Sequence, residues 1–160
     1  MTTLKRFNPT GNLSHFAALL YVLALILPAI ERTDGEYFFG WQALLLGLPH
    51  VFFASINLVS YTSAEDLLWL APLLLPWFAN LYLPLHFTQI LHIKFKLKYN
   101  LSLAALLIVA LFFIKPVVFD EDSLTFYSTA TPLIGAYCWG LAFLCLFLAN
   151  RSKRTHSNEH

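Results

Sequence analysis

The sequence contains few charged residues and only two cysteines. Charged residues make up 12% of its 160 residues, against about 25% in ordinary soluble domains. The formal net charge is +1, so the chain has no overall field that would recruit a nucleic acid or an acidic ligand. Cys138 and Cys145 lie on one expected helix, about 10 Å apart at the helical rise, which is too far for a disulfide. The composition therefore argues against nucleic-acid binding and thiol–disulfide chemistry.

Recognisable catalytic and metal-binding motifs are also missing from the sequence. It has no glycine-rich phosphate loop, no zinc-spaced set of ligands and no nucleophile elbow. The acidic run 120–122 lacks the spaced oxygen ligands of a calcium loop. No charged residue lies in the middle of an apolar segment, which argues against a proton- or ion-coupled transporter. We therefore expect a protein that is not an enzyme and that holds no catalytic residue, metal ion or cofactor.

Apolar segments dominate what is present, since 58% of the residues are hydrophobic. An apolar helix of about 17 residues is enough to cross the hydrocarbon core of a bilayer. Four segments reach or exceed this length: 14–30, 67–93, 101–119 and 131–149. The fold class that they predict is all-α, an integral membrane helical bundle with four transmembrane helices. We expect one bundle domain, 14–149, between a polar N-terminal segment, 1–13, and a basic tail, 150–160.

Residues 41–61 are apolar too, but Gly47 and Pro49 interrupt them. Irregular backbone at membrane depth must be covered by protein, so we interpret this segment as re-entrant or interfacial. The alternative is a bundle of five full spans. In either case, small and polar residues recur at 4-3-4-3-4 spacing and share one helical stripe that faces protein: Ala43, Gly47, His50, Ala54, Asn57 and Tyr61.

The basic residues predict the orientation of the bundle, because Lys and Arg are enriched in cytoplasmic loops. With four spans, eight of the ten basic residues fall on one side, including those in 94–98 and 151–154, and Arg32 and Lys115 fall on the other. Five spans would leave seven on the favoured side. We expect a multi-pass protein of a bacterial inner membrane, with the N-terminus and the C-terminus in the cytoplasm.

Polar side chains inside the apolar segments are the candidates for a ligand site: His50, Asn57, Asn80 and His86. Polar groups in a membrane are costly and suggest function. Pro84 is expected to kink its helix, since its ring displaces the carbonyl group of residue 80. The same polar groups can instead join neighbouring helices or satisfy the kink. Haem is disfavoured, because the last two predicted spans contain no histidine to complete a pair.

The last predicted span carries a row of small residues at 3-4-3-4 spacing: Gly135, Cys138, Ala142, Cys145 and Ala149. Small residues let helix backbones approach closely in membranes. We interpret this row, the small-residue seam, as a helix-packing surface and its cysteines as packing residues. The seam meets either another helix of the same chain or a second copy of the protein.

Three short motifs follow one another along the chain: YFFGWQALLLG at 37–47, WFAN at 77–80 and GAYCWGLA at 135–142. They resemble the YYGWxxLLLG, WxAN and GYxLWLAS motifs of small, uncharacterised, multi-spanning bacterial inner-membrane proteins. Leu81 stands where that family has a proline. The resemblance implies a helical membrane protein and transfers no activity.

These features favour three functions. The first is a non-enzymatic membrane protein that acts through helix packing or a partner, as an accessory subunit or an immunity-type protein. The second is a binder of a small hydrophobic ligand, a lipid, quinone or haem, between the stripe in 41–61 and the kinked helix 67–93. The third is a holin-like pore former. The expected partners are the lipid bilayer and a membrane protein, a periplasmic protein or a second copy, but no nucleic acid.

Overall fold

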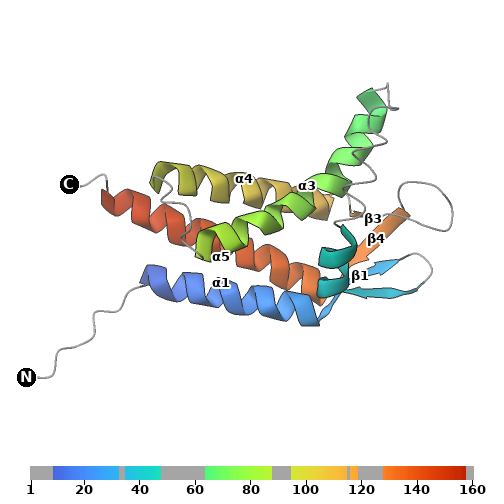
Figure 1. Ribbon diagram of the computed structural model, residues 1–160, viewed down its shortest axis with the longest axis horizontal. Coiled ribbons are helices and arrows are strands. Elements are labelled where there is room, and N and C mark those ends of the chain that lie inside the picture. Colours follow the sequence, from blue (N-terminus) through green and yellow to red (C-terminus); the bar gives the residue numbers. More distant parts are fainter. Residues whose placement is uncertain are drawn as a thin grey trace, which may run out of the picture.

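The computed structural model describes residues 9–32, 35–47, 64–87, 95–114, 116–118 and 128–157. The chain is mostly helical, which confirms the predicted helical class. Four long helices form a bundle: α1 (Pro9–Ile26), α3 (Ala64–Phe87), α4 (Phe95–Ile114) and α5 (Ile134–Ser157) (Figure 1). A small sheet lies at one end of the bundle, which we call the sheet end. α1 begins and α5 ends at the opposite end, the far end (Figure 1).

Two helices end earlier than predicted because a proline follows each of them. α1 ends at Ile26 instead of Ile30, and Pro28 begins the next strand. α4 ends at Ile114 instead of residue 119, two residues before Pro116. Proline has no amide hydrogen and disfavours the helical conformation of the residue before it. The sequence contained this signal, and the predicted ends were wrong because apolar character alone set them.

Other helix boundaries extend into segments that the sequence assigned to polar ends. α1 begins at Pro9, inside the predicted N-terminal segment, and proline is well suited to the first turn of a helix. α5 continues to Ser157, through most of the predicted tail. Arg and Lys are good helix formers, so a helix need not stop where its apolar run stops. α3 is described as far as Phe87, and the predicted continuation to residue 93 lies outside the described residues.

A four-stranded antiparallel sheet, in the order β2-β1-β4-β3, was not expected from the sequence. Its strands are β1 (Pro28–Arg32), β2 (Tyr37–Phe39), β3 (Val117–Val118) and β4 (Ser128–Pro132). β1 and β2 form a hairpin whose turn contains Gly35 at a φ of +84°, a conformation that favours glycine. β1 also pairs with β4, so the sheet ties the end of α1 to the start of α5.

The bundle core is built from all four long helices. Ala17 of α1, Ala79 and Leu83 of α3, Val109 of α4 and Phe143 of α5 belong to one cluster, in which each is at most 3% exposed. Small residues alternate with large ones there, which lets the helices interdigitate. α5 packs against α1 and α4, and Trp139 and Asn150 of α5 form hydrogen bonds with Asn80 and Tyr82 of α3, so α5 contacts all three other long helices.

Two helices of the described residues are long and apolar enough to cross a membrane. The qualifying segments are Leu97–Ile114, with a mean hydropathy of 2.1, and Ile134–Ser152, with 1.4. Asn12–Ile26 is apolar but shorter, because β1 takes up the last residues of the predicted first span. Length and composition therefore do not support the predicted four spans. Of the segment 41–61, residues 41–47 are helical, and the remainder lies outside the described residues.

Candidate functional site

Asn80 joins three helices of the bundle. Its Oδ1 atom accepts a hydrogen bond from Nε1 of Trp139 in α5, at 2.8 Å. The same atom accepts a second bond from the hydroxyl group of Tyr21 in α1, at 3.3 Å. Because an indole nitrogen can only donate, the atom it meets must be the carboxamide oxygen, and the nitrogen Nδ2 lies on the other side of the group. We call Asn80, Tyr21 and Trp139 the asparagine node.

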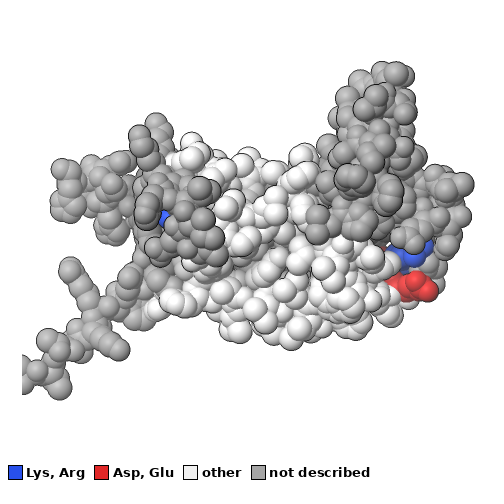
Figure 2. Space-filling model, in the orientation of Figure 1, with Lys and Arg blue, Asp and Glu red and all other residues white. Residues whose placement is uncertain are grey.

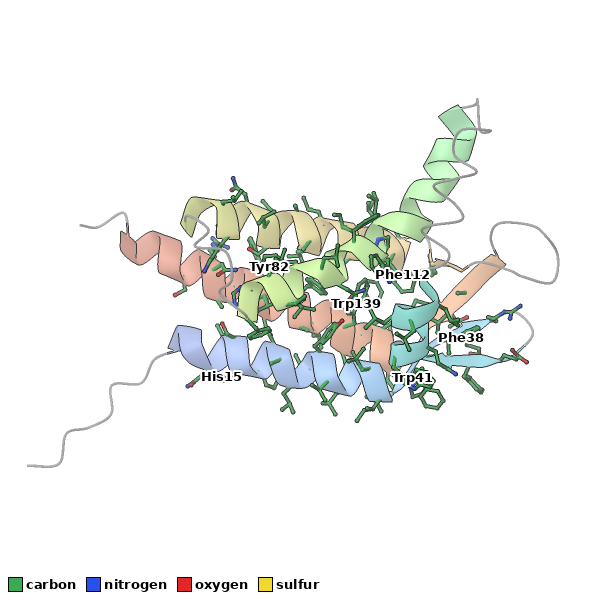
Figure 3. All side chains as sticks on the ribbon, in the orientation of Figure 1. His15, Phe38, Trp41, Tyr82, Phe112 and Trp139 are labelled. Atoms are coloured by element: carbon green, nitrogen blue, oxygen red, sulfur yellow. The ribbon has the colours of Figure 1, made fainter. Side chains whose placement is uncertain are left out.

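The surroundings of Trp139 hold its ring, and hence the donor, in place. The ring packs edge-on against Phe112 of α4 and Phe143 of α5, with centroid distances of 5.9 and 5.6 Å. Edge-to-face pairs of this kind are favourable beyond the area that they bury. The labelled side chains of Trp139 and Phe112 extend into the bundle interior from neighbouring helices (Figure 3). The hydrogen bond to Asn80 is therefore made by a rigid donor.

A half-open apolar pocket of about 310 Å³ lies beside the asparagine node. α1, the helical segment 40–47 and α3 line it with seven residues: Tyr21, Leu44, Leu45, Trp77, Asn80, Leu81 and Pro84. Nε1 of Trp77 donates to the carbonyl oxygen of Leu44 at 2.9 Å, which fixes the segment against α3. A Cβ atom on Gly47 would overlap the Trp77 indole ring, so glycine permits this close approach. The pocket thus lies between the two elements that the sequence singled out.

A second polar cluster lies nearer the far end. The hydroxyl group of Tyr82 accepts a 2.8 Å bond from Nδ2 of Asn150 and donates to the carbonyl oxygen of Lys98 at 3.3 Å. Nδ1 of His86 lies 3.3 Å from the same hydroxyl group. Asn150 is 2% exposed and Tyr82 is 7% exposed. Buried polar groups that form hydrogen bonds with one another in this way join helices at little cost. We therefore interpret this cluster as a structural contact between helices.

The structure describes three of the predicted ligand residues, and it places Asn80 and Pro84 apart from His86. Asn80 and Pro84 line the pocket, whereas His86 faces the Tyr82 cluster one turn further along α3. His50 and Asn57 lie outside the described residues. The part of the chain that the structure describes contains no group of three His, Cys, Asp or Glu side chains placed to hold a metal ion.

Three members of the small-residue seam are buried within the chain itself. Gly135, Ala142 and Ala149 are buried and share one face of α5, since they are seven residues apart. A Cβ atom on Gly135 would come within 2.8 Å of the carbonyl oxygen of Leu27, so glycine allows α5 to start directly beneath the end of α1. Cys138 and Cys145 are half-buried and unbridged.

The partners of Asn80 and the Tyr82 cluster could not be identified from the sequence. Tyr21, Trp139 and Asn150 were absent from the predicted site residues, although each is a hydrogen-bonding side chain within or beside an apolar run. A hydrogen-bonding side chain in such a position needs a partner, and this need was the signal that the sequence offered. Which of them approach one another depends on how the helices rotate and pair, and the sequence does not encode this in any local pattern.

Replacing Asn80 with alanine is expected to lower the free energy of unfolding by about 1–2 kcal/mol, because Trp139 and Tyr21 lose their acceptor inside the bundle. Thermal unfolding of the purified protein in mild detergent would measure the loss. Asn100→Ala is the matched control, since Asn100 is exposed on α4. Equal stability of the two variants would show that the asparagine node does not hold the helices together.

Comparisons of the chain with protein-family models, with curated proteins and with solved structures found no match, so the resemblance noted in the sequence stays a prediction.

Proposed function

We propose that the chain is a multi-pass protein of a bacterial inner membrane in which α1, α3, α4 and α5 all cross the bilayer. In this proposal it is not an enzyme and acts through helix packing or a partner, as an accessory subunit or an immunity-type protein. The membrane placement is supported first by the helical bundle, which contains two apolar helices of membrane-spanning length among the described residues. It is supported more specifically by the positions of the charged side chains.

The observation that carries the proposal is an uncharged belt between two charged ends. Of the charged side chains that the structure describes, three lie at the sheet end, in or beside β1 and β2, and two at the far end: Glu31, Arg32 and Glu36, and Lys98 and Arg151. Figure 2 shows charged surface at both ends and uncharged surface between them on the visible face. From Ile134 to Arg151 along α5 the helical rise gives about 26 Å. The hydrocarbon core of a bilayer is about 30 Å thick.

The outer faces of the helices are as apolar as the interior. On α5, five exposed apolar residues recur at 3-4-3-4 spacing beside the small-residue seam: Ile134, Tyr137, Leu141, Leu144 and Leu148. On α1, Phe16, Leu19, Val22 and Ile26 are more than half exposed. Contiguous apolar surface of this kind on a folded bundle suits contact with lipid or with another membrane protein. The basic far end would lie in the cytoplasm by the distribution of Lys and Arg.

A lysine in the middle of α4 tests the membrane placement. Leu107 is 59% exposed, and a lysine at the centre of a membrane span costs about 2.5–3.5 kcal/mol on insertion. We expect Leu107→Lys to reduce strongly the fraction of protein that resists extraction of membranes with alkaline carbonate. Leu97→Lys is the control in the same helix, because Leu97 neighbours Lys98 at the far end, where a long side chain can reach the interface.

A different result is expected if α4 does not lie in a membrane. On a helix surrounded by water, exposed leucine-to-lysine changes alter stability by about 0.5 kcal/mol or less. If Leu107→Lys and Leu97→Lys fractionated alike, or if the wild-type protein left the membrane with carbonate, α4 would not span a bilayer.

The partner part of the proposal needs a separate experiment. Solubilisation in mild detergent, followed by native gels and affinity capture, should give a complex larger than one chain, with a second membrane protein or a second copy. A strictly monomeric species under all mild detergents would count against action through a partner while leaving the membrane placement intact.

A further inference from the structure

Asn80 lines the pocket beside the asparagine node, and one donor of its carboxamide makes no hydrogen bond with the described residues. Of its polar lining groups, the hydroxyl group of Tyr21 donates to Asn80, and the indole nitrogen of Trp77 donates to Leu44. The carboxamide of Asn80 uses Oδ1 for both of its bonds, and among the described residues Nδ2 has no partner. An amide donor without a partner is unfavourable in an apolar surrounding. An occupant that brings one oxygen acceptor would satisfy it.

The Asn80 donor lies inside the bundle, some distance along the helices from the sheet end. Tyr21 precedes the end of α1 by five residues, and Trp139 follows the start of α5 by five residues, which places Asn80 about 8 Å inside the bundle by the helical rise. The ester carbonyls of phospholipids stay with their headgroups at the membrane surface. The acceptor must therefore belong to an uncharged molecule whose oxygen can enter the hydrocarbon layer.

The shape and lining of the pocket narrow the choice further. Its volume of about 310 Å³ lies at the small end of the range of about 300–1,000 Å³ for ligand sites. Trp77 and Tyr21 present aromatic surface from α3 and α1, and the leucines of segment 40–47 present aliphatic surface. A single flat ring fits this volume and lining better than the two acyl chains of a glycerolipid, while the half-open side lets a tail leave toward lipid.

We propose that this pocket binds a lipid-soluble quinone, with one ring carbonyl oxygen accepting a hydrogen bond from Nδ2 of Asn80 and the ring lying against Trp77. The proposal concerns binding and includes no electron transfer. It goes beyond the membrane placement and rests on it, because the choice of an uncharged acceptor assumes that the pocket lies in the hydrocarbon layer. Its experiment is separate from the carbonate extraction and the native gels, so the two proposals can fail independently.

Quenching of tryptophan fluorescence tests the proposal on the full-length protein in mild detergent, because a quinone ring in contact with an indole ring quenches its emission. Titration with a short-chain benzoquinone should give saturable quenching. Leu45→Phe fills the pocket and changes neither hydrogen bond of Asn80, and it should weaken binding about tenfold by overpacking. Asn80→Leu removes the donor and should weaken binding about fivefold.

Leu107→Phe is the matched control, since Leu107 on α4 and Leu45 at the pocket are 59% and 58% exposed. It should bind the benzoquinone like the wild-type protein. Quenching that never saturates, or that is equal in wild type, Leu45→Phe and Leu107→Phe, would show that the benzoquinone only partitions into the detergent and would overturn the proposal. Organic extracts of the purified wild-type and Leu45→Phe proteins give a second readout. If the Leu45→Phe extract contained less glycerolipid than the wild-type extract, and neither contained a quinone, the proposal would also be overturned.

Discussion

Replacing Gly40 with alanine is expected to lower the free energy of unfolding by about 3 kcal/mol, at the upper end of the usual effect of overpacking. Gly40 follows β2 and opens the helical segment 40–47. A Cβ atom there would overlap the backbone carbonyl group of Ala24 and lie 3.0 Å from the Cα atom of Leu25. The amide group of Gly40 also donates to the carbonyl oxygen of Leu27 at 3.1 Å, so the segment cannot move away without breaking this bond.

The matched control is the same substitution at Gly140, in the middle of α5. A Cβ atom at Gly140 would meet the ring of Phe113 at 2.9 Å, a side chain that can turn, rather than backbone. Alanine also favours the helix over glycine by about 1 kcal/mol. Thermal unfolding in detergent should therefore separate the two variants by about 6 °C or more. If Gly140→Ala lost as much stability as Gly40→Ala, the tight contact between segment 40–47 and the end of α1 would not be a fixed part of the fold.

The helices could be predicted from the sequence because each is a long apolar run, which is a local property. The sheet could not, since its strands have two to five residues, too few to show alternation. Its pairing is also non-local: Ile30 lies opposite Pro132, and Arg32 lies opposite Ala130. Nothing within either segment specifies a partner so distant. The sheet follows instead from helix packing, because α1 and α5 lie side by side and bring the chain segments at their ends together.

The asparagine node was likewise only partly predictable from the sequence. Asn80 could be singled out because an amide within an apolar run must find a partner. Its partners, Tyr21 and Trp139, are each 59 residues away, one before it and one after it. Helical periodicity says which residues share a face, but not which face meets which helix. The pocket depends on the same unknown, since it requires the helical segment 40–47 to lie against α3, through a bond from Trp77 to a backbone carbonyl group that no side-chain pattern marks.

Replacing Phe143 with alanine should be the most damaging change in the bundle interior, with a loss of about 3–5 kcal/mol in the free energy of unfolding. Phe143 is 1% exposed at the centre of α5 and belongs to the cluster that joins all four long helices. Helix association in a membrane depends mainly on close packing, so the cavity left by a phenyl ring removes contacts that lipid does not replace. Thermal unfolding in detergent would measure the loss.

Phe16→Ala, the same substitution on the outer face of α1, distinguishes interior packing from general loss of apolar surface. Phe16 is 51% exposed, so its removal should change stability by about 0.5 kcal/mol or less. A second readout is local: the ring of Trp139 lies 5.6 Å from that of Phe143, and its emission should shift in Phe143→Ala but not in Phe16→Ala. Equal stability of the two variants would place Phe143 at the surface. The order of helices around α5, on which the asparagine node and its pocket depend, would then be wrong.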